Sequence, residues 1–138
     1  MGSIRVETIY AAPIGAVWRA LTDPEELASW LMPNDFQPVV GHQFTFRTHP
    51  APGFDGIVHC EVLEVELERR LSYSWVGGGV KTQVSFTLEP HGAGTKLTLL
   101  HSGFAGARGV LVQKILSTGW RSMVLRRLGE HVEAMAAG

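Results

Sequence analysis

The spacing of apolar residues changes along the chain and divides its first third into two parts. In residues 4–10, apolar and polar side chains alternate, and this period of two predicts a half-buried strand. Residues 14–31 switch to helical spacing, with an interruption near the middle. Asp23 is a favourable N-cap and Pro24 suits a first helical turn, so this stretch predicts two short helices in succession.

The period returns to two between residues 39 and 102. Apolar and polar residues alternate there in five segments, separated by turn sequences rich in glycine and proline. Short turns between successive strands are typical of an antiparallel meander. Residues 103–109 are rich in small side chains and are expected to form a loop. Helical spacing resumes from about Leu111 to Met135, which gives the predicted order β-α-α-β-β-β-β-β-α.

This order predicts an α+β fold in which a curved antiparallel sheet of six strands surrounds a long C-terminal helix. That helix would span ~35 Å at 1.5 Å per residue, enough to cross the whole sheet. Its apolar residues fall on one broad stripe: Ile115, Leu116, Trp120, Val124, Leu128, Val132 and Met135. A chain of 138 residues has the usual size of one domain, so we expect residues 1–138 to form a single domain.

Composition and charge narrow the classes of function. The chain is 45% apolar and 18% charged, as globular proteins are. A formal net charge of −1 argues against a nucleic-acid partner, and the small basic cluster of Arg121, Arg126 and Arg127 is interpreted as the solvated face of the last helix. No apolar run approaches the ~20 residues of a membrane span, and no leader pattern is present. A cytoplasmic location is therefore expected.

Metal and cofactor motifs are missing from the sequence. Cys60 is the one cysteine, and it is interpreted as a small buried hydrophobe within a strand. None of the six histidines pairs with another at the spacing that metal binding requires on a strand or a helix, so a structural zinc is not expected. No phosphate-binding glycine motif and no nucleophile elbow occur. We expect no cofactor.

Several blocks of sequence resemble one known family in their order and spacing. They are Ala12-Pro13-x-x-x-Val17-Trp18-x-x-Leu21-Thr22-Asp23-Pro24-Glu25-x-Leu27-x-x-Trp30, Gly56-x-Val58-x-x-Glu61-Val62-x-x-Val65, Arg70-Leu71-x-Tyr73-x-Trp75, Gly94-Thr95-x-Leu97-Thr98-Leu99-x-His101-Ser102-Gly103-Phe104, and Gly119-Trp120. The chain is similar to the family named for activators of the heat-shock protein 90 ATPase, within the START-like (SRPBCC, Bet v 1-like) superfamily. This resemblance covers nearly the whole chain. It implies a helix-grip fold, in which a curved sheet holds the C-terminal helix over a cavity.

The resemblance implies three kinds of function. Superfamily members bind lipids, hormones and polyketides, so we expect a cavity that binds a small hydrophobic or amphipathic ligand. Some members catalyse cyclisation or dehydration, so an enzyme acting on polyketide-like substrates is the first alternative. The founding members contact a chaperone, so a protein-interaction module is the second alternative. Its partner would be a chaperone or a second copy of the chain, as a homodimer.

A pocket between sheet and helix is lined mainly by apolar and aromatic groups, with a few polar groups that orient the ligand. The candidate lining residues are Phe44, Phe46, Tyr73, Trp75, Val84, Phe86, Leu99, His101, Phe104, Trp120 and Val124, with Trp30 near the entrance. Plain core packing is the alternative interpretation, because aromatic side chains bury a large area with or without a ligand.

Tyr73 and His101 are the polar candidates, because alternation places each beside bulky apolar neighbours. A buried phenol or imidazole needs a hydrogen-bond partner, which a ligand, the backbone or a buried water would supply. If the protein is an enzyme, His101 would be the general acid or base and Tyr73 the donor that polarises a carbonyl. Thr82 and His59 are weaker candidates for the same site.

Overall fold

The computed structural model describes residues 2–137 and contains a six-stranded antiparallel sheet. The strands are β1 (Gly2–Tyr10), β2 (Gln43–Arg47), β3 (Ile57–Glu66), β4 (Arg70–Gly77), β5 (Val80–His91) and β6 (Gly94–Phe104). They lie in the order β1-β6-β5-β4-β3-β2, so β2 to β6 form the predicted meander and β1 adds to the β6 side. The predicted α+β fold class and element order are confirmed.

Two short helices follow β1, as the interrupted helical spacing predicts. They are α1 (Ile14–Thr22) and α2 (Pro24–Trp30). Asp23 caps α2, because its Oδ1 accepts the backbone N–H groups of Glu25 at 2.9 Å and Glu26 at 3.4 Å. Pro24 occupies the first turn, where no N–H is required. The local cap therefore sets the angle between the two helices.

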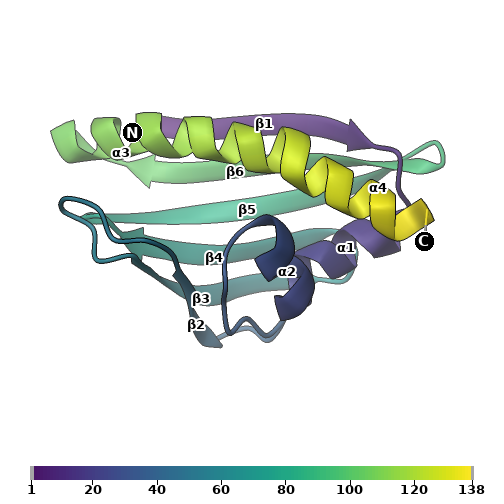
Figure 1. Ribbon diagram of the computed structural model, residues 1–138, viewed down its shortest axis with the longest axis horizontal. Helices are drawn as coiled ribbons and strands as arrows, with labels where there is room; N and C mark the ends of the chain where they lie inside the picture. The colour runs from purple at the N-terminus through teal and green to yellow at the C-terminus, as the bar shows by residue number, and fades with distance from the viewer. Residues whose placement is uncertain (1, 138) are drawn as a thin grey trace.

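The C-terminal helix consists of α3 (Gly106–Ser122), a π-helical segment (Met123–Leu128) and α4 (Gly129–Ala137). Figure 1 shows them as one rod along the length of the sheet. The helix begins earlier than predicted, because Gly109 packs against the end of β6: a Cβ at Gly109 would lie 2.9 Å from the carbonyl carbon of Phe104. The small residues expected to form a loop thus form the first turn of α3.

The π-helical segment meets the end of β1. The Tyr10 hydroxyl donates a hydrogen bond of 2.7 Å to the carbonyl oxygen of Val124, and both residues are buried. A π-helical turn contains an extra residue, which interrupts the regular hydrogen-bond ladder. This contact ties the C-terminal helix to β1 at the end of the strand.

The predicted apolar stripe of the last helix is wrong at one position. Ile115 is 63% exposed, whereas Trp120, Val124, Leu128 and Val132 are buried. At ~100° per residue, Ile115 points ~140° away from Trp120 around the helix axis. The true stripe therefore passes through the neighbouring residue, Leu116, which is half-buried and packs against the core.

The two ends of the sheet are built differently (Figure 1). At one end, α1 and α2 lie beside α4. At the other end, the loop between β2 and β3 and the turn between β4 and β5 lie near the start of α3.

None of the helices in the described part of the chain has the length and hydropathy needed to cross a bilayer.

Candidate functional site

The structure places all twelve candidate lining residues in the interior. None of them is more than 4% exposed: they are Trp30, Phe44, Phe46, Tyr73, Trp75, Val84, Phe86, Leu99, His101, Phe104, Trp120 and Val124. Those on strands belong to the alternating positions that face the C-terminal helix. Their rings pack edge to face or tilted, with centroids of neighbouring aromatic rings 4.8–6.2 Å apart.

His101 lies at the centre of a hydrogen-bonded chain that joins four elements. The Trp120 indole N–H donates to His101 Nδ1 at 2.9 Å. On the other side of the ring, His101 Nε2 lies 2.7 Å from Thr82 Oγ1, which in turn lies 2.9 Å from the carbonyl oxygen of Trp75. The chain links α3 to β6, β5 and β4.

Only one proton arrangement satisfies this chain. Because the Trp75 carbonyl has no proton, the Thr82 hydroxyl must donate to it and therefore accepts the proton on His101 Nε2. Nδ1 is then unprotonated, its lone pair accepts the hydrogen bond from the indole N–H, and the imidazole is neutral. Burial lowers the pKa of His101 from 6.5 to about 3. Both ring nitrogens are occupied, so His101 fixes the position of α3 on the sheet.

In contrast to His101, Tyr73 has a polar group that no other group satisfies. Its side chain is fully buried, and its hydroxyl is the one buried side-chain N or O atom in residues 2–137 that has no hydrogen-bond partner. Rings surround it, with the centroid of Phe44 at 5.2 Å and those of Phe46 and Phe86 at 6.0 and 6.1 Å. Burial raises the pKa of Tyr73 well above its usual value, so the phenol keeps its proton.

His101 and Tyr73 share one row of the sheet. Val84 pairs with His101 on one side and with Tyr73 on the other, and Ile4 and Val62 extend the row at either end. Two strand spacings, ~10 Å, thus separate the two backbones, on the same face. Ring contacts run from Tyr73 through Phe86 and Trp120 to His101.

Trp30 and Cys60 are also in the core. Trp30 is fully buried and donates its indole N–H to the Ala20 carbonyl oxygen at 2.9 Å, so it lies among α1 and α2 and not at an entrance. Cys60 is 5% exposed, and burial raises the pKa of its thiol. The thiol therefore stays protonated and packs as a small apolar group.

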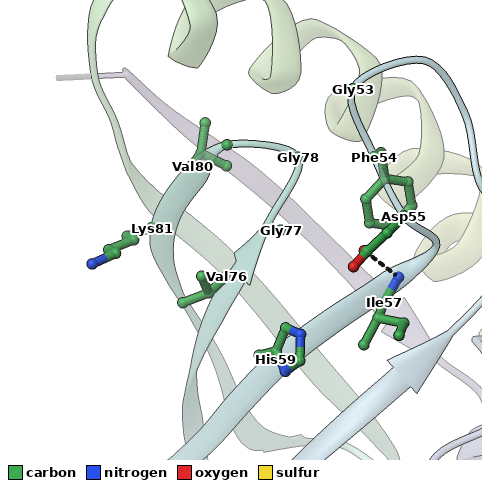
Figure 2. Close-up of a pocket in the computed structure, with 11 residues that line it drawn as sticks. Gly53, Phe54, Asp55, Ile57, His59, Val76, Gly77, Gly78, Val80 and Lys81 are labelled. Carbon is green, nitrogen blue, oxygen red and sulfur yellow. Dashed lines mark hydrogen bonds between the residues drawn. The ribbon is translucent and has the colours of Figure 1, made fainter.

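Two hollows of the surface both lie next to His59 and Val76, on β3 and β4. The larger, ~570 Å³, lies between the β2–β3 loop and the β4–β5 turn (Figure 2). The smaller, ~390 Å³, extends along β2 and β3, and Phe44 is the one candidate lining residue that borders either hollow. His59 is exposed on the outer face of the sheet, whereas Thr82 is buried on the inner face.

No three His, Cys, Asp or Glu side chains gather in the described residues at a spacing that could hold a metal ion. The hollow of Figure 2 contains Asp55, His59 and Lys81, but Asp55 Oδ1 accepts the Ile57 N–H at 3.1 Å.

Sequence reasoning missed Arg108, at the start of α3. Its Nε donates to the Gly78 carbonyl oxygen at 2.8 Å and its Nη2 to the Gly53 carbonyl oxygen at 2.9 Å. The side chain thus joins α3 to the β4–β5 turn and to the β2–β3 loop. No local pattern indicates this contact, because the three segments that it joins are far apart in the sequence.

The fold agrees with what comparison with known proteins finds. Residues 11–133 match the family described as Activator of Hsp90 ATPase homolog 1-like protein. The chain belongs to this family. The resemblance seen in the sequence blocks is therefore confirmed.

Solved structures of similar fold extend the comparison. Protein MLL2253 from Mesorhizobium loti is 32% identical with a TM-score of 0.87, over 96% of this chain and 98% of that chain. DynU16, a protein of the dynemicin biosynthetic locus, is 29% identical with a TM-score of 0.78, over 97% of this chain and 48% of that chain. Comparison with curated proteins gives no match.

A third neighbour shows the fold alone, because its sequence identity is low. The Aha1 dimer from Colwellia psychrerythraea is 21% identical with a TM-score of 0.80, over 96% of this chain and 97% of that chain. Proteins of this architecture thus include one that is a dimer and one from a biosynthetic locus.

Proposed function

We propose that this protein binds a small hydrophobic or amphipathic molecule between the sheet and the C-terminal helix, with an oxygen atom of the ligand hydrogen-bonded to the Tyr73 hydroxyl. One observation carries the proposal: the Tyr73 hydroxyl is buried among aromatic rings without a partner. A buried hydroxyl that makes no hydrogen bond costs about 1–3 kcal/mol. A ligand oxygen at this position would recover that free energy.

The surroundings of Tyr73 suit such a ligand. Ligand pockets are mainly apolar and aromatic, with a small number of placed polar groups. Around Tyr73 the polar group is the hydroxyl, and Phe36, Phe44, Phe46 and Phe86 supply the aromatic walls. His101 is a wall residue in this proposal, since both of its nitrogens are already bonded.

The interior is closed in this form, so binding requires that packed groups move apart. The half of the C-terminal helix before Trp120 is the element best able to move. Within α3, only Gly109 and Trp120 are buried. The β2–β3 loop and the β4–β5 turn lie at the same end, which makes this end the proposed route of entry (Figure 1).

The experiment compares Tyr73→Phe with the unaltered protein in binding two aromatic ligands of the same shape, 2-naphthol and 2-methylnaphthalene. We expect 2-naphthol to bind the unaltered protein more tightly, and Tyr73→Phe to weaken 2-naphthol by about 10-fold while 2-methylnaphthalene changes little. Quenching of tryptophan fluorescence gives both affinities.

The matched control is Tyr10→Phe, because the chain has two tyrosines and the Tyr10 hydroxyl already donates to Val124. This variant should bind both ligands as the unaltered protein does. If neither ligand binds, or if Tyr73→Phe leaves 2-naphthol unaffected, the proposed role of the hydroxyl is wrong.

A protein-interaction function is a second candidate, favoured by exposed apolar residues on the outer side of the C-terminal helix. Val110, Leu111, Ile115 and Leu125 are 52%, 56%, 63% and 48% exposed. A neighbour of the same fold is a dimer. The candidate partner is a second copy of this chain, and analytical ultracentrifugation of Ile115→Lys beside the unaltered protein tests it. A monomer in both samples contradicts it.

An enzyme of the cyclase type, the first alternative from the sequence, is also a candidate, since DynU16 comes from a biosynthetic locus. In that case His101 would have to release Trp120 or Thr82 before it could accept a proton. Turnover of a polyketide-like substrate that is lost in His101→Gln but kept in His59→Gln would support this function over binding alone.

A further inference from the structure

Arg108 holds together the three segments that surround the proposed route of entry. Its Nε and Nη2 atoms donate to two carbonyl oxygens, of Gly78 and Gly53, at 2.8 and 2.9 Å. These two nitrogens form one edge of the guanidinium group. Two oxygens along one such edge reproduce the arrangement in which a single carboxylate binds arginine through both of its oxygens.

Glycine residues shape the space around this guanidinium. A Cβ at Gly53 would lie 2.5 Å from Arg108 Nη2, and a Cβ at Gly79 would lie 3.1 Å from Arg108 Nε. Both glycines have positive φ, +79° and +82°, which side chains of other residues rarely adopt. The loop and the turn are therefore built to bring backbone oxygens close to Arg108.

The charge of Arg108 is not neutralised by its partners. Both acceptors are neutral carbonyls, and among the described residues no carboxylate forms an ion pair with this guanidinium. Asp55 is on the same loop but accepts the Ile57 N–H. Hydrogen bonds to a charged acceptor are roughly twice as strong as those between neutral groups. A ligand carboxylate would therefore compete well for this edge.

Apolar side chains lie close to the glycines of the β4–β5 turn, which Arg108 contacts. A Cβ at Gly77 would lie 3.4 Å from the Phe54 ring, and one at Gly78 would lie 4.0 Å from a methyl group of Val112. Phe54 and Val112 are both half-buried and pack against the core. Exposure thus falls from the Arg108 cation, which is exposed, through these two half-buried side chains to the buried aromatic interior.

We propose that Arg108 recognises the carboxylate of an amphipathic acid, and that this carboxylate takes the place of the Gly53 and Gly78 carbonyl oxygens. The inference rests on the proposed function and names the class of ligand: a carboxylic acid with an aliphatic or aromatic body that enters between α3 and the sheet. Since a carboxylate on the Nε–Nη2 edge displaces both carbonyl oxygens, recognition of the head group in this way also releases the β2–β3 loop and the β4–β5 turn from α3.

The experiment uses pairs of probes that share a body and differ in charge: laurate with dodecanol, and 2-naphthoate with 2-naphthol. Isothermal titration measures each affinity for the unaltered protein, Arg108→Gln, Arg108→Lys and the control Arg121→Gln. Arg121 is an exposed arginine on the same helix, away from the two loops. We expect each acid to bind the unaltered protein about 10-fold more tightly than its neutral partner.

Arg108→Gln should remove that preference and leave the neutral probes within about 2-fold of their original affinity, and Arg121→Gln should change neither. Arg108→Lys should keep part of the preference, since it retains the charge but not the two-nitrogen edge. Equal binding of acid and neutral probe, or an unchanged preference in Arg108→Gln, overturns this inference and leaves the proposed function standing. Absence of binding by all four probes overturns both.

Discussion

The two ends of the C-terminal helix are held in different ways. Beyond Trp120, four residues of the π-helical segment and α4 are buried, namely Val124, Leu128, Gly129 and Val132. Before Trp120, only Gly109 is buried, and Arg108 fixes the helix start through two exposed hydrogen bonds. One end is part of the core, whereas the other is tied to loops. We therefore expect the first end to contribute more to stability, and under the proposed function ligand exchange takes place at the second.

Side-chain contacts at the α4 end support this contrast. The Tyr10 hydroxyl donates to the Val124 carbonyl oxygen, His131 Nε2 lies 2.6 Å from a carboxylate oxygen of Glu26, and the Ala11 backbone N–H donates to Glu133 at 3.0 Å. Together they join the last helix to β1 and α2. At the α3 end, besides Arg108, Gln113 donates to the Ser3 carbonyl oxygen at 3.0 Å. Opening that end therefore breaks few side-chain hydrogen bonds.

The same substitution at the two ends should give the largest difference. Leu128→Ala removes a fully buried side chain, so we expect the free energy of unfolding to fall by about 2–5 kcal/mol. Leu116→Ala removes a half-buried one before Trp120, and we expect a loss of about 1 kcal/mol. Urea denaturation of both variants measures the two losses. Equal losses would contradict the contrast between the ends.

The His101 chain meets the C-terminal helix at Trp120, between its two halves, and the pH dependence of His101 should give the next largest effect. The pKa of His101 is lowered to about 3 in the folded protein, whereas unfolded histidine titrates near 6.5. The unfolded chain thus binds more protons between these values, so stability is lost as the pH falls. From about pH 7 to about pH 5, this one group should lower the free energy of unfolding by about 2 kcal/mol.

The measurement is a series of urea denaturations over that pH range, with His101→Gln as the control that lacks the titrating group. The variant should be less stable at neutral pH and should have a flatter pH dependence. Parallel pH curves for the two proteins would show that His101 is protonated equally in the folded and unfolded chains.

The two tyrosines should respond to loss of their hydroxyl groups with opposite signs. Tyr10→Phe removes the hydrogen bond to Val124, and we expect a loss of about 1 kcal/mol. Tyr73→Phe removes a buried hydroxyl without a partner, and we expect a gain of about 1 kcal/mol in the absence of ligand. Thermal unfolding of the two variants compares them, and destabilisation by both would contradict the assignment of Tyr73.

The smallest effect on global stability is expected at Arg108. Arg108→Gln should change the free energy of unfolding by less than about 1 kcal/mol, because the side chain is exposed. Hydrogen exchange should nevertheless speed up in residues 48–56 and in the first turns of α3, and should stay unchanged around Leu128. Uniform exchange changes along the helix would contradict a local tether.

The sequence by itself determined the elements and which side of each strand is buried. Alternation placed Tyr73, Trp75, Val84 and His101 on one face, because side-chain direction in a strand has a period of two and depends only on local order. The sequence also predicted the start of α2, because Asp23 is a favourable N-cap and Pro24 suits the first turn. The start of α3 at Gly106 was not predicted, because it depends on how closely Gly109 approaches Phe104.

Only the tertiary structure decided what each buried polar group contacts. His101 and Tyr73 look alike in the sequence, yet Trp120 and Thr82 occupy both nitrogens of one, and the other has no partner. Arg108 acquires its role from Gly53 and Gly78, which lie 55 and 30 residues away. Periodicity records which face a residue occupies. Hydrogen-bond partners depend on distances between segments, and these are set by the packing of the whole chain.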